Sequence, residues 1–345
     1  MSFVTPECQA TTLSSPFGTI IPLEKKIKGF PKTKPKKILL IAGPTACGKS
    51  ALSLLLAKLL HGEVISADSM QVYRGMDIGT VKVSQEDQAA VPHHLLDIRH
   101  VQEPFNVVDF YYEARQCCES ILSRDRVPLV VGGSGFYFRT LIYGPPEGPP
   151  PIPDIRHSLE EEMEELGSLK MFEKLKVLDP NYAKTITSND RHKIIRAMEI
   201  VTLTGKSVSE HKWEQIHPLP DFSHHCWFVY KPREILYPLI DARCEQILEA
   251  GFLEEVQELE KAGIRTNPSA SQAIGYRQAL DFLSTSQDEK ANNEFVRKFK
   301  TASRHYAKRQ FTWFRKEPLF RWLDVDRHDL ETAAELIAQD FLSTP

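Results

Sequence analysis

The sequence predicts an α/β protein, in which a parallel sheet carries helices on both faces and an all-helical domain is inserted into the chain. Three observations predict this class. Apolar runs alternate with helical patterns from residue 37 to about residue 144, as in sheets whose parallel strands are joined by helices. A proline-rich break at 144–154 then leads into a charge-rich helical stretch. Finally, the apolar run HCWFVYKP at 225–232 indicates a return to the sheet.

The first elements surround a glycine-rich loop. Residues 43–50 read G-P-T-A-C-G-K-S, which matches the phosphate-binding pattern G-x-x-x-x-G-K-[ST], the P-loop. The apolar run 38–42 before it predicts a buried strand, and the Leu- and Ala-rich run 51–60 predicts a helix. This order points backbone N–H groups and a helix N-terminus at an anion. We therefore expect a P-loop-type sheet with a diphosphate cradle made of Gly43, Pro44, Thr45, Ala46, Cys47, Gly48, Lys49 and Ser50.

Two further strands follow in the same part of the chain. The segment EVISADS at 63–69 predicts a strand that ends at Asp68, and RVPLVVGGSG at 126–135 predicts a strand that runs into glycines. The segment 106–125 between them predicts a helix. Ligands of parallel sheets bind at the carboxyl ends of the strands. The P-loop, Asp68 and the turn at 132–134 should therefore converge on one crevice.

The same patterns divide the chain into parts. Residues 1–36, with scattered Pro, Ser and Thr and a run of lysines, predict a disordered basic extension. Residues 145–214 predict a helical insertion domain. Residues 37–144 and 215–345 together predict the P-loop core, with C-terminal helices at 233–263 and 272–314.

Composition and charge exclude several classes of protein. No apolar run is long enough to span a bilayer. The net charge of −3 over 345 residues gives no global sign of nucleic-acid binding. The six cysteines include no C-x-x-C pair and no zinc-ligand spacing, so these thiols fit a reducing compartment. We expect a cytoplasmic monomer.

A P-loop also occurs in kinases and other nucleotide hydrolases, which place an Asp for Mg²⁺ at the end of a second apolar strand. The strand VPLVV instead ends in Gly132 and Gly133, and only the weaker segment HHLLDI offers a candidate, Asp97. No N-K-x-D guanine signature is present. A small-molecule kinase stays an alternative, and ATP binding by the loop stays open. The sequence contains little evidence for nucleotide hydrolysis.

Local charge differs from the global balance in the segment 297–316, which holds eight Lys or Arg and no Asp or Glu. Near-helical spacing places five of its cations near one face, namely Arg297, Lys300, Arg304, Lys308 and Arg315. Aromatic residues interleave with them at Tyr306, Phe311, Trp313 and Phe314. A solvated helix with its aromatics in the core is the alternative, but such faces normally mix both signs. The stripe therefore favours binding to the phosphates of a nucleic acid.

These features together resemble the tRNA dimethylallyltransferase family, also called tRNA isopentenyltransferases, in its compact bacterial type. The matching stretches run in family order from about residue 38 to residue 323. They are AGPTACGKSALS, EVISADSMQVYRGMDIGTVK, VPHHLLDI, LVVGGSGFYFRTL, NDRHKIIRAMEI, SQAIGYRQAL and AKRQFTWFRK. The chain departs from the family in having Cys47 where Ser is usual and in lacking the zinc-finger extension of eukaryotic members.

The resemblance implies one reaction, the transfer of a dimethylallyl group from dimethylallyl diphosphate to N6 of adenine 37, next to the anticodon, in tRNAs that read codons beginning with U. It implies four catalytic residues, Asp68, Lys49, Arg243 and Ser134. Asp68 would take the proton of the amine, and Ser134 stands where the family has Thr. Arg243 would join the P-loop on the diphosphate, and Ser50 would bind Mg²⁺. From the residues alone, Asp68 also fits a turn and Arg243 a surface helix.

The resemblance also implies contacts to tRNA. Gln71, Gln310 and Arg277 would read base edges, whereas Lys308, Arg309 and Arg315 would bind phosphates. The full set is Asp68, Ser69, Met70, Gln71, Ser134, Arg156, His192, Lys193, Ile194, Ile195, Arg196, Gln272, Ala273, Ile274, Gly275, Tyr276, Arg277, Lys308, Arg309, Gln310, Phe311, Thr312, Trp313, Phe314 and Arg315.

Two further alternatives remain. An adenylate isopentenyltransferase, which prenylates free AMP or ADP, would need neither the helical insertion nor the basic helix. A non-catalytic tRNA-binding protein would have no reason to keep Asp68, Lys49 and Arg243 together.

Overall fold

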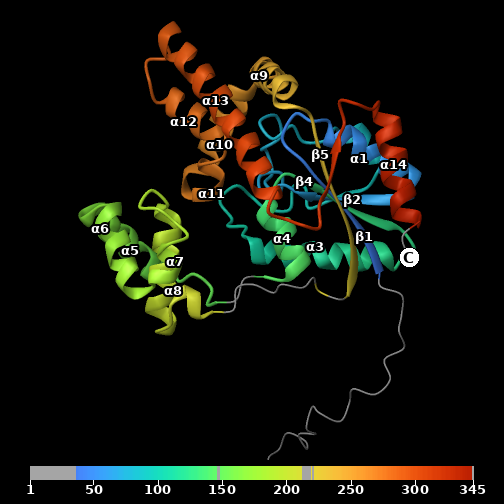
Figure 1. Cartoon of the computed structure of the whole chain (residues 1–345). Coiled ribbons are helices and arrows are strands. Elements are labelled where there is room, and N and C mark those ends of the chain that lie inside the picture. The colour runs from blue at the N-terminus through green and yellow to red at the C-terminus, as the bar shows by residue number, and fades with distance from the viewer. Residues whose placement is uncertain (1–35, 146–147, 212–218, 220, 344–345) are drawn as a thin grey trace, which may run out of the picture. The chain divides into compact units, whose positions relative to one another are not determined.

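The computed structural model describes residues 36–145, 148–211, 219 and 221–343. Within them, six strands form one parallel sheet in the order β3-β2-β4-β1-β5-β6. Figure 1 labels its central strands β2, β4, β1 and β5. The strands are β1 (Lys36–Ala42), β2 (Gly62–Ala67), β3 (His93–His94), β4 (Val127–Gly132), β5 (Phe222–Tyr230) and β6 (Arg321–Asp324). The predicted parallel sheet is confirmed. The predicted extension at 1–36 lies, apart from Lys36, outside the described residues.

The carboxyl ends of three central strands lie level with one another. Ala42 at the end of β1 pairs with Gly132 at the end of β4, and Gly132 pairs with Ala67 at the end of β2. A Cβ atom at Gly132 would lie 2.2 Å from the carbonyl oxygen of Ala67, so this approach requires glycine. Strand β2 ends one residue before Asp68, which therefore begins the loop at this edge of the sheet.

Helices cover both faces of the sheet (Figure 1). Helix α1 (Lys49–Leu59) packs on α14 (Leu330–Ser343), and α3 (Val107–Leu122) packs on α4 (Gly135–Tyr143). The crossovers through α1 and α3 run in opposite directions along the sheet, so right-handed connections put these two pairs on opposite faces. Residues 38–42 of β1 are fully buried, as expected for a strand covered on both sides.

In the described part of the predicted insertion there are four helices and a short turn. They are α5 (Pro153–Leu166), α6 (Ser168–Leu178), α7 (Pro180–Ala183), α8 (Arg191–Thr204) and the 3₁₀ turn η2 (Val208–Glu210). Their buried apolar residues, such as Met163, Met171 and Leu175, form a hydrophobic cluster separate from the one around the sheet. The helical content agrees with the sequence, and the domain boundaries at 145 and 214 stay a prediction.

The C-terminal helices are more divided than the sequence predicts. They are α9 (Arg233–Glu249), α10 (Phe252–Lys261), the 3₁₀ turn η3 (Ile264–Thr266), α11 (Pro268–Ser271), α12 (Tyr276–Leu283) and α13 (Glu289–Phe314). The predicted run 233–263 breaks at Gly251, whose left-handed φ of +94° separates α9 from α10. Helix α2 (Gln85–Ala90), β3, β6 and α14 are additions to the prediction. No described helix combines the length and the apolar composition that a membrane span requires.

Candidate active site

The P-loop joins β1 to α1 and leaves the first turn of α1 without a side-chain cap. Gly48 occupies the N-cap position in the left-handed conformation, with φ +93°. Lys49 is half-buried and donates to the carbonyl oxygen of Pro44 at 2.6 Å. Burial lowers the pKa of Lys49 below its usual value, and Arg243 adds to this effect while Asp68 opposes it. The loop thus presents an uncapped helix N-terminus and a cation, which together suit an anion.

One cavity of about 600 Å³ collects most of the predicted catalytic groups. Asp68 lines it from the end of β2, Arg243 lines it from α9, and Gly132 and Gly133 line it from the end of β4. The cradle residues that line it are Thr45, Ala46, Gly48, Lys49 and Ser50. The structure therefore brings the P-loop, Asp68 and the glycine turn together, as their places at strand ends predict.

Three members of the predicted cradle and one predicted catalytic residue stand behind this lining. Gly43, Pro44 and Cys47 do not line the cavity, and the Cys47 thiol lies 3.5 Å from the carbonyl oxygen of Val229 in β5. Ser134 also stands back from the cavity, near the hydroxyl of Tyr306. The Cys47 side chain that replaces the usual Ser is therefore accommodated by packing rather than by contact with a ligand.

Asp68 closes a local turn and also places a carboxylate in the cavity. Its Oδ1 accepts a hydrogen bond from the backbone N–H of Met70 at 2.8 Å, which closes a local turn. Its negative charge opposes the lowering of the pKa that burial causes at Lys49 and Arg243. Among the described residues, no hydrogen bond engages Oδ2. The turn thus holds a carboxylate in the cavity and leaves one oxygen for a ligand.

Tyr306 of α13 lines the cavity, whereas the sequence pattern indicated it only as an aromatic residue within the basic stripe. Burial raises the pKa of its hydroxyl, and the charge of Asp68 raises it further, so the hydroxyl stays protonated. Arg309 and Gln310 line the same cavity. Tyr306 precedes them by three and four residues, which places all three on one helix face. This spacing is the sequence signal that could have identified it.

The two glutamines predicted to read bases are engaged within the chain. Gln310 is buried, where its Oε1 accepts from Thr45 N–H at 3.2 Å and its Nε2 donates to the Gly133 carbonyl at 3.1 Å. Gln71 accepts from the Ser66 hydroxyl at 2.8 Å and donates to the Thr80 carbonyl at 3.3 Å. Each amide thus has one partner at its oxygen and one at its NH₂ group, and these contacts brace the cavity wall. Base reading would use the remaining N–H and lone pair of each amide, and it stays a prediction.

The basic stripe on α13 is only partly available to a polyanion. Arg297 pairs with Glu294, Lys300 with Glu245 at 2.5 Å, and Arg304 with Asp241 at 2.7 Å. These cations already have acidic partners, and phosphate binding by this first half stays a prediction. Helical spacing identifies residues that share a face but not the acidic residues that α9 places opposite Lys300 and Arg304.

The cations in the second half of the stripe remain available to a polyanion. Lys308, Arg309 and Arg315 are exposed and form no ion pair among the described residues. A groove of about 900 Å³ runs along this half, lined by Arg139, His305, Lys308, Arg309, Thr312, Trp313, Lys316 and Glu317. Arg309 lines both this groove and the cavity. Trp313, 39% exposed, lies with its ring centre 6.2 Å from that of Phe136, which is 45% exposed.

Two predicted tRNA contacts in the insertion hold that part of the chain together. Arg156 of α5 and Arg196 of α8 both donate to Oε2 of Glu199, at 3.0 and 2.6 Å. Glu199 is fully buried, and its Oε1 also accepts from the backbone N–H of Ile152 at 3.1 Å. These guanidinium groups compensate a buried carboxylate, and contact of their exposed parts with tRNA stays a prediction.

We expect Glu199→Gln to lower the free energy of unfolding by about 2–3 kcal/mol, at the lower end for a broken buried ion pair because both arginines are partly exposed. Denaturant unfolding checks this result. Glu161→Gln on α5, where the side chain is exposed, is the matched control and should unfold like the parent. Equal stability of the two variants would contradict the structural role of Glu199.

Other members of the predicted tRNA set fall into buried and accessible groups. Ile194, Ile195 and Phe314 are buried in hydrophobic cores, so direct contact from their side chains to tRNA does not fit the structure. His192, Lys193, Gln272 and Arg277 are exposed. The members of the set that line the cavity are Asp68, Ser69, Met70, Gln71, Gln272, Ala273, Ile274, Tyr276, Arg309 and Gln310.

The alternative kinase carboxylate is placed elsewhere. Asp97 does not line the cavity, and its Oδ1 accepts from Nζ of Lys82 at 2.6 Å. It therefore cannot serve as a metal-binding carboxylate beside the P-loop in this arrangement, which removes the one sequence candidate for that role.

Comparison with known proteins identifies the family. The family model described as IPP transferase matches residues 71–317. The chain belongs to this family. A tRNA dimethylallyltransferase of Protochlamydia amoebophila is 59% identical over 320 residues, which are 92% of this chain and 93% of the relative. A protein of the same name from Chlamydia pneumoniae is 49% identical over 338 residues, 97% of this chain and 98% of the relative.

Solved structures of the family agree with the fold. The full-length tRNA isopentenylpyrophosphate transferase of Bacillus halodurans is 37% identical, with a TM-score of 0.64 over 89% of this chain and 97% of that one. A eukaryotic dimethylallyltransferase described as acting on tRNA is 28% identical, with a TM-score of 0.72 over 89% of this chain and 80% of that one. The family resemblance, the fold class and the assignment as an enzyme of this transferase family are confirmed.

Proposed function

We propose that this chain transfers a dimethylallyl group from dimethylallyl diphosphate to N6 of adenine 37 in tRNAs that read codons beginning with U. The observation that carries the proposal is the shared cavity. It holds an uncapped P-loop and two cations beside one carboxylate, and Arg309 joins it to a basic groove. This arrangement offers one place for a diphosphate, one for a proton and one for a polyanion.

The diphosphate would bind to the backbone N–H groups of the P-loop with Lys49 and Arg243. As the bond between C1 of the dimethylallyl group and oxygen breaks, negative charge grows on the leaving diphosphate, and fixed cations and N–H dipoles stabilise it. Both side chains lose hydration in the cavity, which is why burial lowers their pKa values. An anion between them offsets this cost.

The described residues are compatible with a magnesium ion whose ligands come mainly from the substrate diphosphate. They include no cluster of three or more His, Cys, Asp or Glu that could hold a metal alone. Ser50 is exposed in the cavity lining, and its hydroxyl would hold Mg²⁺ together with diphosphate oxygens. When bound, the ion would neutralise charge on the leaving group.

Asp68 would act as the general base. The adenine N6 amine is a weak nucleophile because its lone pair is delocalised into the ring. As N6 forms its bond to C1, it loses a proton, and the free Oδ2 of Asp68 would accept it. The target base must first leave its stack in the anticodon loop, which costs a few kcal/mol that contacts in the groove must offset.

The groove beside Arg309 would hold the RNA strand, and its two kinds of contact can be separated by salt. We expect Lys308→Met to reduce the slope of log affinity against log salt by about 0.7–0.9, because one phosphate contact is lost. We expect Trp313→Leu to weaken binding by about tenfold with an unchanged slope, because base stacking releases no counterion. Titration of an anticodon stem-loop at several salt concentrations measures both. A reduced slope in Trp313→Leu with no loss of affinity would contradict the stacking role.

The experiment that tests the function offers labelled dimethylallyl diphosphate and Mg²⁺ with either unmodified tRNA or free AMP. The tRNA carries adenines at positions 36 and 37. Label in tRNA and none in AMP supports the proposal. Label in AMP alone would make the chain a free-nucleotide prenyltransferase. Label in neither substrate would contradict the proposal and favour the small-molecule kinase alternative. Because every residue invoked belongs to one chain, we also propose an active monomer. Its six cysteines without a C-x-x-C pair favour a reducing compartment, so we propose that it acts in the cytoplasm.

A further inference from the structure

One wall of the cavity is a loop segment with an unusually constrained path. Gly79, Thr80 and Val81 line the cavity without belonging to a helix or strand. Val81 has a left-handed φ of +48°. A Cβ atom at Gly79 would lie 2.4 Å from Phe252 and 2.6 Å from the Tyr276 hydroxyl oxygen, so only glycine fits there. The segment is thus in close contact with α10 and α12. A small shift of its backbone would change the shape of the cavity.

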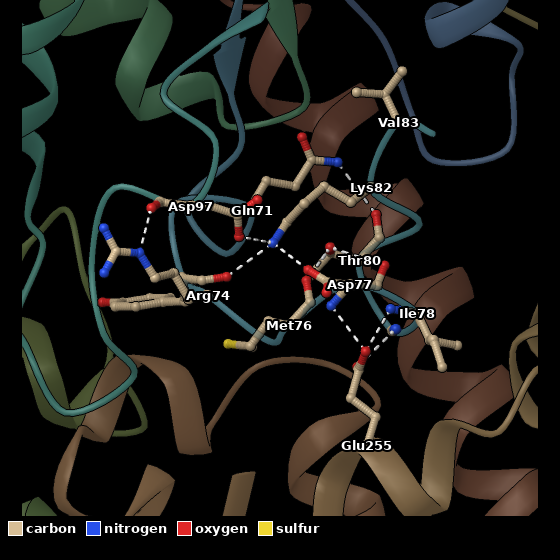
Figure 2. Close-up of polar contacts among 12 residues, drawn as sticks. Gln71, Arg74, Met76, Asp77, Ile78, Thr80, Lys82, Val83, Asp97 and Glu255 are labelled. Carbon is tan, nitrogen blue, oxygen red and sulfur yellow. Dashed lines mark hydrogen bonds and ion pairs between the residues drawn. The ribbon is translucent and has the colours of Figure 1, made fainter. Parts of the chain in front are cut away.

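A single carboxylate from α10 holds this segment. Oε2 of Glu255 accepts the backbone N–H groups of Asp77 and Ile78 at 2.9 and 2.6 Å (Figure 2). Its Oε1 accepts the N–H of Gly79 at 3.1 Å and the hydroxyl of Tyr276 at 2.7 Å. Four donors thus converge on two oxygens. Only a carboxylate accepts at both ends, since a glutamine would turn its NH₂ group toward donors.

The other end of the segment is tied to the loop that starts at Asp68. Nζ of Lys82, whose side chain is 5% exposed, donates to Asp77 at 2.5 Å, to Asp97 at 2.6 Å and to the Tyr73 carbonyl at 2.9 Å (Figure 2). The Thr80 carbonyl accepts from Gln71, which itself accepts from Ser66 of β2. Hydrogen bonds therefore run from Glu255 through this wall to the strand that carries Asp68 at its end.

We propose that Glu255 is a positioning residue for the transfer reaction. It holds the 77–81 wall in the one path that keeps a ligand in the cavity aligned with Asp68. Through Tyr276, it also joins this wall to the 272–277 stretch, part of which lines the same cavity. The inference rests on the proposed function, because the ligands that Glu255 would align are its two substrates, dimethylallyl diphosphate and the target adenine.

The test compares Glu255→Gln with Glu254→Gln, which removes the same charge from the exposed neighbouring position on α10. Both are assayed with tRNA and dimethylallyl diphosphate, well below their unfolding midpoints. We expect Glu255→Gln to lower kcat by about tenfold or more while KM for both substrates changes by less than about threefold, because alignment rather than binding is lost. Glu254→Gln should match the parent. An unchanged kcat in Glu255→Gln would overturn the proposal.

Hydrogen exchange supplies a readout that does not depend on activity. The amides of Asp77, Ile78 and Gly79 should exchange faster in Glu255→Gln than in Glu254→Gln, and unchanged exchange would also overturn the proposal. Tyr276→Phe is a milder second variant that removes one donor and leaves the three amides protected, with a smaller fall in kcat. If the parent chain transfers no label to tRNA, the proposed function fails, and the exchange result alone then decides whether Glu255 holds the segment.

Discussion

Replacing Asp68 by asparagine should lower kcat for dimethylallyl transfer to tRNA by about 10²–10⁴-fold, the usual contribution of a positioned general base. Asparagine keeps an acceptor for the Met70 N–H and therefore preserves the turn that Asp68 closes. It has no group that can take the N6 proton. Single-turnover transfer of labelled dimethylallyl, measured beside tRNA affinity, separates the two roles. Affinity for tRNA should stay close to that of the parent.

Asp68→Ala is the companion variant, since it removes both the base and the turn. If asparagine restored activity that alanine lacks, the turn would be the only role of Asp68. If tRNA affinity fell as far as turnover in both variants, the general-base assignment would be wrong.

Replacing Lys49 by methionine should lower kcat by about 10²–10³-fold, because a fixed cation no longer stabilises charge on the leaving diphosphate. Methionine keeps much of the length of the side chain and suits a helix. Initial rates over a range of dimethylallyl diphosphate concentrations give kcat and KM, and KM should rise as well. Lys58→Met, on the exposed last turn of the same helix, is the matched control and should behave like the parent.

A Lys49→Met variant that transfers dimethylallyl normally would contradict a role for the Lys49 cation on the leaving diphosphate. An ATP-binding measurement would then test whether the loop serves another anion.

Much of the site was predictable because local chemistry defines it. The P-loop requires its glycines and Lys49 at fixed spacing, and the flanking apolar and helical runs identify it. Asp68 and the turn at 132–134 follow strands whose parallel arrangement brings their ends together. The short strands β3 and β6 could not be predicted in the same way, since two and four residues give no clear periodicity.

By itself, the sequence determined the fold class, the family and the group of residues that meets at the strand ends, because these depend on local patterns and motifs. Only the tertiary structure decided which charged and polar side chains remain free. Lys300 and Arg304 meet acidic residues of α9, and Gln71 and Gln310 brace the wall. Glu255 reaches a loop 176–178 residues away. Such partners depend on how distant elements pack, and residue spacing along one helix contains no information about them.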